Sequence, residues 1–156
     1  MADIEARLAE LGIELPEVVP PVAAYTPAVL DGHYVYTSGQ LPMVSGAMPG
    51  TGKVGEGPGL VSPSDAKEYA RFSALNALAA AKSVLGSLDR VRRVVKVVGF
   101  VASDPAFTGQ PGVINGASGV LGDIFGDAGV HARSAVGVAA LPLDSPVEVE
   151  LILAVD

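Results

Sequence analysis

One segment of this 156-residue chain, Arg92–Ala102, limits the possible folds more than any other, because it is apolar on both faces of a strand. Alternate residues of a strand point to opposite sides of a sheet. Val95, Val97 and Val101 would lie on one side, and Val94, Val98 and Phe100 on the other. A strand of this kind belongs in the interior of a sheet whose two faces are both covered.

Local signals predict the elements around this strand. In chain order they are a short helix capped by Asp3, strands at 23–30 and 33–38, a helix from Ser62 to Gly86, the strand at 92–102, a helix after Pro111, and strands at 133–141 and 147–155. The dipeptide Asp31-Gly32 between the first two strands is typical of a two-residue hairpin. Residues 42–59 form a long loop rich in Gly and Pro.

This order of elements predicts an α+β fold, a mixed β-sheet with two helices on one face. The helical connection from the second strand to the third predicts a parallel pair, and the hairpins at each end predict antiparallel pairs. Two helices cover one face only, so the other apolar face needs a cover, and a second copy of the chain is the expected one. We divide the chain into an N-terminal helical extension, residues 1–20, and a single domain, residues 21–156.

Charge and composition exclude several classes of function. Ten basic against seventeen acidic side chains give a net charge of −7, which argues against binding to nucleic acid. The chain has no cysteine, so disulfides, thiolate metal sites and a cysteine nucleophile are excluded. No basic segment precedes an apolar run at the N-terminus, and no apolar run is long enough to span a membrane. We therefore expect a cytoplasmic protein with no membrane association.

Arg133 is the most informative single residue, because it is the only Lys or Arg between Lys96 and the end of the sequence. It begins a strand whose next seven residues are small or apolar. Its charge could lie at the strand end with its stem on apolar surface, or could pair with a structural carboxylate. The functional alternative is a planar fork at a sheet edge that binds a carboxylate ligand through two hydrogen bonds.

Glu148 and Glu150 share one face of the last strand, opposite the neighbouring valines. Either they form a solvated edge, or one of them lies beside Arg133 across the hairpin that joins the last two strands. In the second case it would act as a base or a water-positioning group. His131 lies two residues before Arg133 and could line the same pocket, whereas His33 is predicted on the hairpin surface. The two histidines show no metal-ligand spacing.

Two sequence blocks resemble the Rid family, also called YjgF or reactive-intermediate deaminases. The first consists of Tyr25 and Thr37-Ser38-Gly39-Gln40-Leu41-Pro42, and the second of Ala132-Arg133-Ser134, Leu141-Pro142 and Val147-Glu148-Val149-Glu150. The strand at 94–101 and Asn115 on the second helix lie between the blocks in the expected order. The resemblance extends from about Ala23 to the C-terminus.

The resemblance implies a chorismate-mutase-like fold, a homotrimer with a central barrel, and a site in the clefts between adjacent subunits. It also implies hydrolysis of 2-imino acids, or their enamine tautomers, to 2-oxo acids and ammonia, without a cofactor or metal. By this resemblance, Arg133 would bind the substrate carboxylate and Glu148 would position or activate the attacking water. Tyr25, Ser38, Gly39 and Asn115 would line the pocket.

Three positions depart from the family pattern. Ala135 stands where many deaminating members have cysteine, His131 stands where proline is usual, and Ala23-Ala24 replace a Gly-Pro pair. Because these changes alter the pocket, a second hypothesis is a non-catalytic protein that binds a small carboxylate metabolite. A third, which the net charge disfavours, is an endoribonuclease or translation inhibitor.

Overall fold

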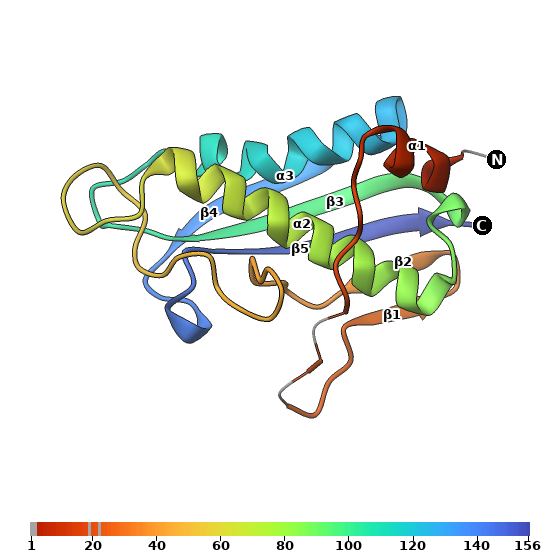
Figure 1. Cartoon of the computed structure of the whole chain (residues 1–156), viewed down its shortest axis with the longest axis horizontal. Helices are drawn as coiled ribbons and strands as arrows, with labels where there is room; N and C mark the ends of the chain where they lie inside the picture. The colour runs from red at the N-terminus through yellow and green to blue at the C-terminus, as the bar shows by residue number, and fades with distance from the viewer. Residues whose placement is uncertain (1–2, 19, 22) are drawn as a thin grey trace.

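The computed structural model describes residues 3–18, 20–21 and 23–156, and it shows one five-stranded mixed β-sheet with helices on one side (Figure 1). Residues 1, 2 and 19 of the expected N-terminal extension, and residue 22, lie outside the described residues. The elements are α1 (Ile4–Glu10), β1 (Ala28–Asp31), β2 (Tyr34–Thr37), α2 (Pro63–Leu85), β3 (Val91–Ala102), α3 (Gln110–Phe125), β4 (Ala132–Val138) and β5 (Val147–Val155), with 3-10 turns at Leu88–Arg90, Gly126–Gly129 and Pro142–Asp144. The predicted α+β class is confirmed.

The strand order β1-β2-β5-β3-β4 confirms one predicted pairing and corrects two others. β1 and β2 form the antiparallel hairpin at Asp31-Gly32, with Gly32 in the left-handed region at φ 58°. β2 and β3 are not neighbours, because β5 lies between them and is antiparallel to both. The parallel pair is β3 and β4, joined by α3. β4 ends at Val138, and residues 139–146 then pass the end of β3, so the hairpin predicted between the last two strands is wrong.

The two helix starts predicted at Asp3 and Ser62 are confirmed, and each is capped by a side chain. The hydroxyl oxygen of Ser62 accepts a hydrogen bond from the backbone N–H of Asp65 at 3.1 Å, and Asp3 accepts one from Ala6 at 3.1 Å. α2 ends at Gly86, whose φ of 82° suits a residue without a side chain. α2 packs on β5 and α3 packs on β3 and β4, and the two helices pack against each other.

Four glycines, Gly112, Gly116, Gly119 and Gly122, share one face of α3, and the role of one of them is clear. A Cβ on Gly116 would overlap the carbonyl group of Lys67 on α2, so glycine permits the close approach of the two helices. Gly112, Gly119 and Gly122 have nothing within 4 Å of a Cβ position, and nothing in the structure explains them. Close packing therefore accounts for one of these glycines and not for the whole face.

The side of the sheet beneath the helices forms the core. Val147, Val149, Leu151 and Leu153 of β5 point to this side and are buried. A β-bulge between Val94 and Lys96 shifts the register of β3. As a result Val94 lies on the same side as Val97, whereas strict alternation along the strand predicts opposite sides.

The other face of the sheet is not covered by any helix among the described residues. Val29, Tyr34, Tyr36 and Val136 lie on this face and are each 44–49% exposed. Large exposed apolar side chains on an uncovered sheet face are typical of an interaction face. That a second copy of the chain covers it remains a prediction.

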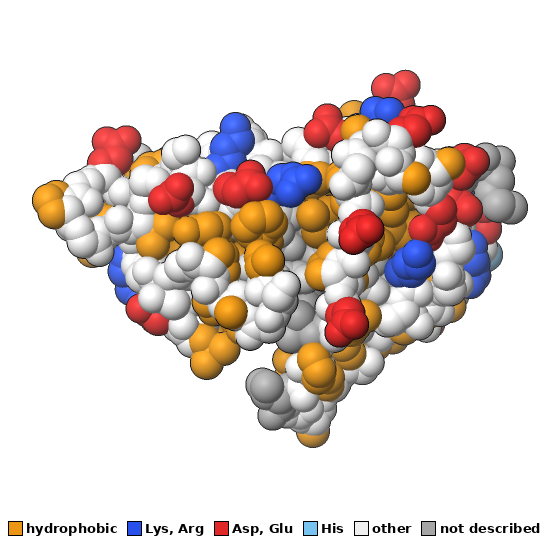
Figure 2. Space-filling view, in the orientation of Figure 1, with side chains coloured by type: hydrophobic (Ala, Val, Ile, Leu, Met, Phe, Trp, Pro, Cys, Tyr) orange, Lys and Arg blue, Asp and Glu red, His pale blue; other side chains and the backbone are white. Residues whose placement is uncertain are grey.

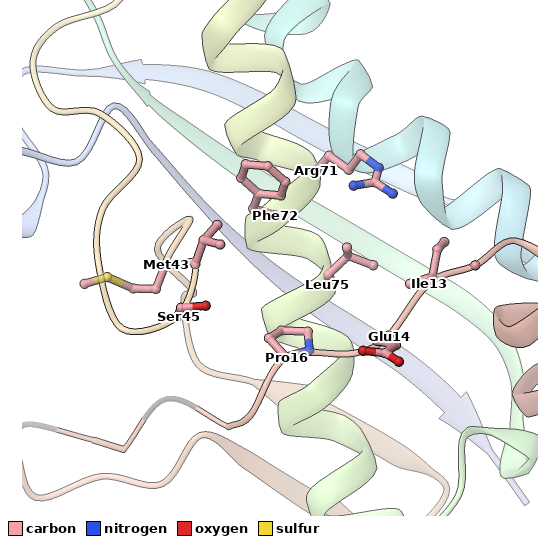
Figure 3. Close-up of a pocket in the computed structure, with 10 residues that line it drawn as sticks. Ile13, Glu14, Pro16, Met43, Ser45, Arg71, Phe72 and Leu75 are labelled. Carbon is pink, nitrogen blue, oxygen red and sulfur yellow. The ribbon is translucent and has the colours of Figure 1, made fainter.

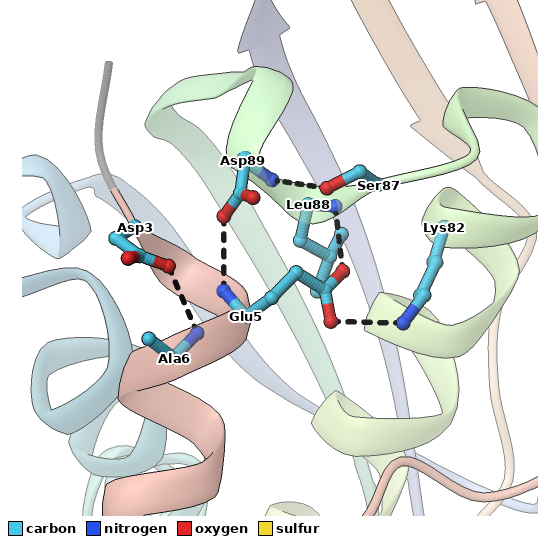
Figure 4. Close-up of polar contacts among 7 residues, drawn as sticks. All are labelled: Asp3, Glu5, Ala6, Lys82, Ser87, Leu88 and Asp89. Atoms are coloured by element: carbon cyan, nitrogen blue, oxygen red, sulfur yellow. Dashed lines mark hydrogen bonds and ion pairs between the residues drawn. The ribbon is translucent and has the colours of Figure 1, made fainter.

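α1 is bound to the rest of the chain by both apolar and polar contacts. Ile4 and Leu8 are buried in the same core as the sheet. The carboxylate of Glu5 accepts hydrogen bonds from Lys82 Nζ at 2.9 Å and from the backbone N–H of Leu88 at 3.0 Å (Figure 4). Partial burial acts to raise the pKa of Glu5, but the hydrogen bonds from Lys82 and Leu88 outweigh it, so the pKa is lowered below its ordinary value.

Candidate functional site

Arg133 lies near the start of β4, and its side chain turns to the helical side of the sheet, toward α3. Its Nη1 donates hydrogen bonds to Asn115 Oδ1 at 2.8 Å and to Ser118 Oγ at 3.1 Å, and its Nη2 makes a longer bond of 3.4 Å to the Pro111 carbonyl. All three acceptors are neutral, and the guanidinium forms no ion pair with any described residue. Nε bonds to no described residue, so the Nε–Nη2 edge of the fork is the side left for a ligand.

His131 joins the same cluster of side chains through Ser118. Its Nε2 lies 2.9 Å from Ser118 Oγ, and its Nδ1 contacts the carbonyl oxygen of Gly129. A carbonyl oxygen can only accept, so these partners assign the ring proton to Nδ1. Nε2 of the neutral ring then accepts the hydrogen of the Ser118 hydroxyl, whose oxygen is turned to Arg133.

Glu148 lies on the uncovered side of the sheet, in register with Phe100 of β3. Its carboxyl group rests against Gly39, where an added Cβ would lie 2.8 Å from Glu148 Cδ. With glycine at position 39 the carboxyl group can lie this close to the backbone, whereas a Cβ here would displace it. Burial, and secondly the charge of Glu150, raise the pKa of Glu148 above its ordinary value of 4.5.

Glu148 borders a cavity of about 510 Å³, which opens where the chain leaves β2. The lining is largely apolar and consists of Pro20, Tyr25, Pro27, Gly39, Gln40, Leu41, Met43, Pro142, Leu143 and Glu148. Three of the predicted site residues, Tyr25, Gly39 and Glu148, therefore come together here. Ser38 precedes the lining residues, and its hydroxyl donates a hydrogen bond to the Thr26 carbonyl at 2.7 Å.

The wall of the cavity at residues 41–43 is tied to α2 by Asn76. The Nδ2 of Asn76 donates to the carbonyl oxygens of Leu41 at 2.9 Å and of Met43 at 3.0 Å. Asn76 is only 3% exposed, and its Oδ1 has no hydrogen-bond partner among the described residues. The sequence analysis missed this residue. An amide within an alanine-rich buried stretch of helix was the signal that could have found it.

The structure brings the predicted site residues together in two groups and not in one. Arg133 and Asn115 meet on the helical side of the sheet, whereas Tyr25, Gly39 and Glu148 meet on the uncovered side. The prediction that a glutamate of the last strand lies beside Arg133 is wrong within one chain. β3 separates β4 from β5, and the two side chains point to opposite sides of the sheet.

A separate hollow of about 290 Å³ lies on the helical face and contains none of the predicted site residues. Figure 3 shows Phe72 and Leu75 projecting from α2, with residues 43–45 to one side and Ile13 to the other. Hydrophobic side chains are visible along this part of the face in Figure 2. The guanidinium of Arg71 at the rim is already paired with a carboxylate of its own helix.

Neither a metal site nor a membrane-spanning helix is found in the part of the chain that the structure describes. No group of three or more His, Cys, Asp or Glu side chains within residues 3–18, 20–21 and 23–156 could hold a metal ion. Over the same residues, each helix is too short or too polar to cross a membrane. His33 lies exposed in the turn between β1 and β2, as the sequence predicts.

The mixed sheet with two helices on one face is a fold that known proteins share. A family model described as "YjgF/chorismate mutase-like, putative endoribonuclease" matches residues 5–155. The chain therefore belongs to the YjgF/chorismate-mutase-like family.

Known proteins resemble the chain over nearly its whole length. It is 42% identical over 153 residues to protein TCP17 of Trypanosoma cruzi, a match that covers 96% of this chain and 92% of the relative. A crystal structure from Shewanella oneidensis, described as a putative endoribonuclease, superposes with a TM-score of 0.92 at 31% identity, covering 99% of this chain and 100% of the other. Escherichia coli TdcF with bound serine superposes with a TM-score of 0.63 at 26% identity, covering 90% and 93%.

Proposed function

We propose that this protein is a cofactor-independent deaminase that hydrolyses reactive 2-imino acids, or their enamine tautomers, to 2-oxo acids and ammonia. The 2-imino forms of butanoate and propanoate represent the substrate class. The observation that carries the proposal is Arg133. Among the described residues its guanidinium bonds only to neutral acceptors, which leaves the Nε–Nη2 edge for a planar anion. Serine bound to the related TdcF supports a small carboxylate ligand.

Glu148 supplies the second chemical group that the reaction needs. A partly buried carboxylate with a raised pKa is a stronger base than an ordinary glutamate, so it takes a proton from water more readily. In the proposed reaction the water oxygen attacks the iminium carbon while Glu148 takes one of its protons, which gives a carbinolamine. Glu148 then passes that proton to the nitrogen of the carbinolamine, and the C–N bond breaks. The hydroxyl proton of the carbinolamine reaches the departing ammonia through Glu148. Iminium and water thus give a 2-oxo acid and ammonium.

The role of the remaining predicted residues is to orient the substrate. Tyr25 and Gly39 line the cavity, Ser38 precedes it, and Asn115 holds Arg133. An imine carbon is already electrophilic, so orientation and a placed water are the main requirements, and alanine at position 135 removes no essential group.

The proposed site needs two copies of the chain, since its two groups of residues lie on opposite sides of one sheet. The exposed apolar side chains of the uncovered face, Tyr34 and Tyr36 among them, support assembly through that face. Arg133 lies on the edge strand β4, where a neighbouring copy can approach. In the proposed homotrimer, Arg133 and Asn115 of one copy complete the cavity that contains Glu148 of the next.

Complementation between two inactive variants tests both the chemistry and this arrangement. Arg133→Ala should lower ammonium release by about 10²–10³-fold, because two charge-assisted hydrogen bonds are lost. Glu148→Gln should lower turnover while it spares pyruvate binding. If the two variants are mixed one to one, unfolded and reassembled, about a quarter of the sites would contain an intact arginine from one copy and an intact glutamate from another. We expect activity to recover toward that fraction.

Each alternative gives a different result in the same experiment. A site contained within one chain predicts no recovery in the mixture. A non-catalytic binding protein predicts pyruvate binding that Arg133→Ala abolishes, with no ammonium release above the spontaneous rate even from the wild type. An endoribonuclease, which the family description names, predicts RNA binding that weakens with salt, and a net charge of −7 opposes it.

A further inference from the structure

Ser118 and His131 extend the contacts of Arg133 into a hydrogen-bonded chain that the proposed reaction does not use. Nη1 of Arg133 donates to Ser118 Oγ at 3.1 Å, and Ser118 Oγ lies 2.9 Å from His131 Nε2. We propose that His131, acting through Ser118, is a positioning residue that holds the guanidinium so that its Nε–Nη2 edge faces the ligand. The inference rests on the proposed function in one respect, namely that the ligand of Arg133 is a carboxylate.

The direction of each hydrogen bond explains how a histidine can act at this distance. A serine hydroxyl has a single hydrogen and can also accept, so where the hydrogen points decides where the lone pairs point. With its hydrogen on His131 Nε2, Ser118 presents a fixed acceptor to Arg133. Without an acceptor at position 131 the hydroxyl rotates, and Nη1 keeps only the bond to Asn115 as a fixed contact.

The far end of the chain is held by backbone groups. Nδ1 of His131 donates to the carbonyl of Gly129, and Gly129 packs so closely on α3 that an added Cβ would lie 2.6 Å from the Leu121 carbonyl oxygen. Arg93 of β3 holds the intervening residue by a 3.0 Å bond to the Val130 carbonyl. The imidazole is therefore fixed by the packing of this segment on α3 and β3, which is what a positioning residue requires.

The ring tautomer tests the hydrogen-bond chain directly. The protein contains two histidines, and the exposed His33 serves as an internal reference in a spectrum of ¹⁵N-histidine-labelled protein. At about pH 8, where an ordinary imidazole is neutral, we expect His131 to carry its proton on Nδ1. Added pyruvate should shift the ring signals of His131 and leave those of His33 in place. A proton on Nε2, or pyruvate binding without a shift at His131, would overturn the proposal.

Kinetic variants test whether the chain positions Arg133. Ser118→Ala and His131→Phe should each raise KM about 5- to 10-fold with kcat within about twofold, since one fixed hydrogen bond to the ligand-binding group is lost. The double variant should resemble either single one, because both break the same chain. His131→Gln, whose amide can accept from Ser118 and donate to Gly129, should recover part of the loss.

Ser134→Ala is the matched control. It makes the same serine-to-alanine change as Ser118→Ala, but it lies one residue after Arg133 on β4 and points to the opposite side of the sheet. Its KM should equal that of the wild type. An unchanged KM in Ser118→Ala, or effects that add in the double variant, would refute the positioning role while the proposed function stands. A wild type that neither turns over imines nor binds pyruvate would refute the proposed function, and this inference with it.

Discussion

Replacing Gly39 by alanine tests whether the position of Glu148 sets the reaction rate. The added Cβ would come closest to Glu148 Oε1 and would lie 2.8 Å from Cδ, so the carboxyl group must move by about 1 Å to reach ordinary van der Waals contact. Because this group is the end of a flexible side chain, a changed rotamer costs about 0.5–1.5 kcal/mol. We expect a folded protein whose melting temperature is about 1–6 °C lower.

The effect on catalysis should be larger than the effect on stability. A shift of this size in a group that handles the attacking water costs on the order of 10–100-fold in kcat. Ammonium release from an imine generated by a coupled amino-acid oxidase measures this loss. Pyruvate affinity, measured by calorimetry, should stay within about twofold, because Arg133 is not affected.

Gly122→Ala is the control, since its added Cβ has nothing within 4 Å and Gly122 does not line the cavity. It should leave kcat unchanged. The reasoning would be refuted if Gly39→Ala had a normal kcat while its crystal structure showed Glu148 displaced. Loss of folding would show that the backbone at position 39 cannot adapt, and that the close contact is a structural requirement.

Three further predictions concern pH, α1 and the helix pair. Since burial and Glu150 raise the pKa of Glu148, kcat should fall as the pH drops through a value above that of an ordinary glutamate, and Glu150→Gln should move this acidic limb to lower pH in a pH–rate profile. Glu5→Gln should lower the free energy of unfolding by about 1–2 kcal/mol at neutral pH. Because the pKa of Glu5 is lowered by folding, this difference should be present above pH 4.5 and should disappear as the pH falls through the folded-state pKa, which urea unfolding at several pH values would show. Gly116→Ala should destabilise the protein by about 1–3 kcal/mol in thermal unfolding, because its Cβ would overlap a backbone carbonyl of α2.

The sequence predicts those parts of the fold that local interactions determine. The Asp31-Gly32 hairpin and the Asp3 cap depend on residues a few positions apart, and both are confirmed. Strand order depends on contacts between distant segments. Adjacent strands in a sequence pair often but not always, and here the chain between β4 and β5 passes the end of β3.

The same limit applies to the candidate site. The residue types of Arg133 and Glu148 and their family motifs pointed to a carboxylate-binding group and a base. The distance between these two side chains could not be predicted. β3 lies between β4 and β5 in the sheet, and the two side chains point to opposite sides of it. Ser118 and Asn76 were missed because their partners lie on segments that no local pattern connects to them.

The cavity beside Glu148 and the hollow beside Phe72 have one lining residue in common. Met43 borders both the cavity of Glu148 and the hollow beside Phe72, and its carbonyl oxygen is held by the amide of Asn76. The backbone at this position is thereby anchored to a 23-residue helix, whereas an unbranched methionine side chain has three rotatable bonds. A change in the rotamer of Met43 would therefore alter the shape of the cavity and of the hollow together.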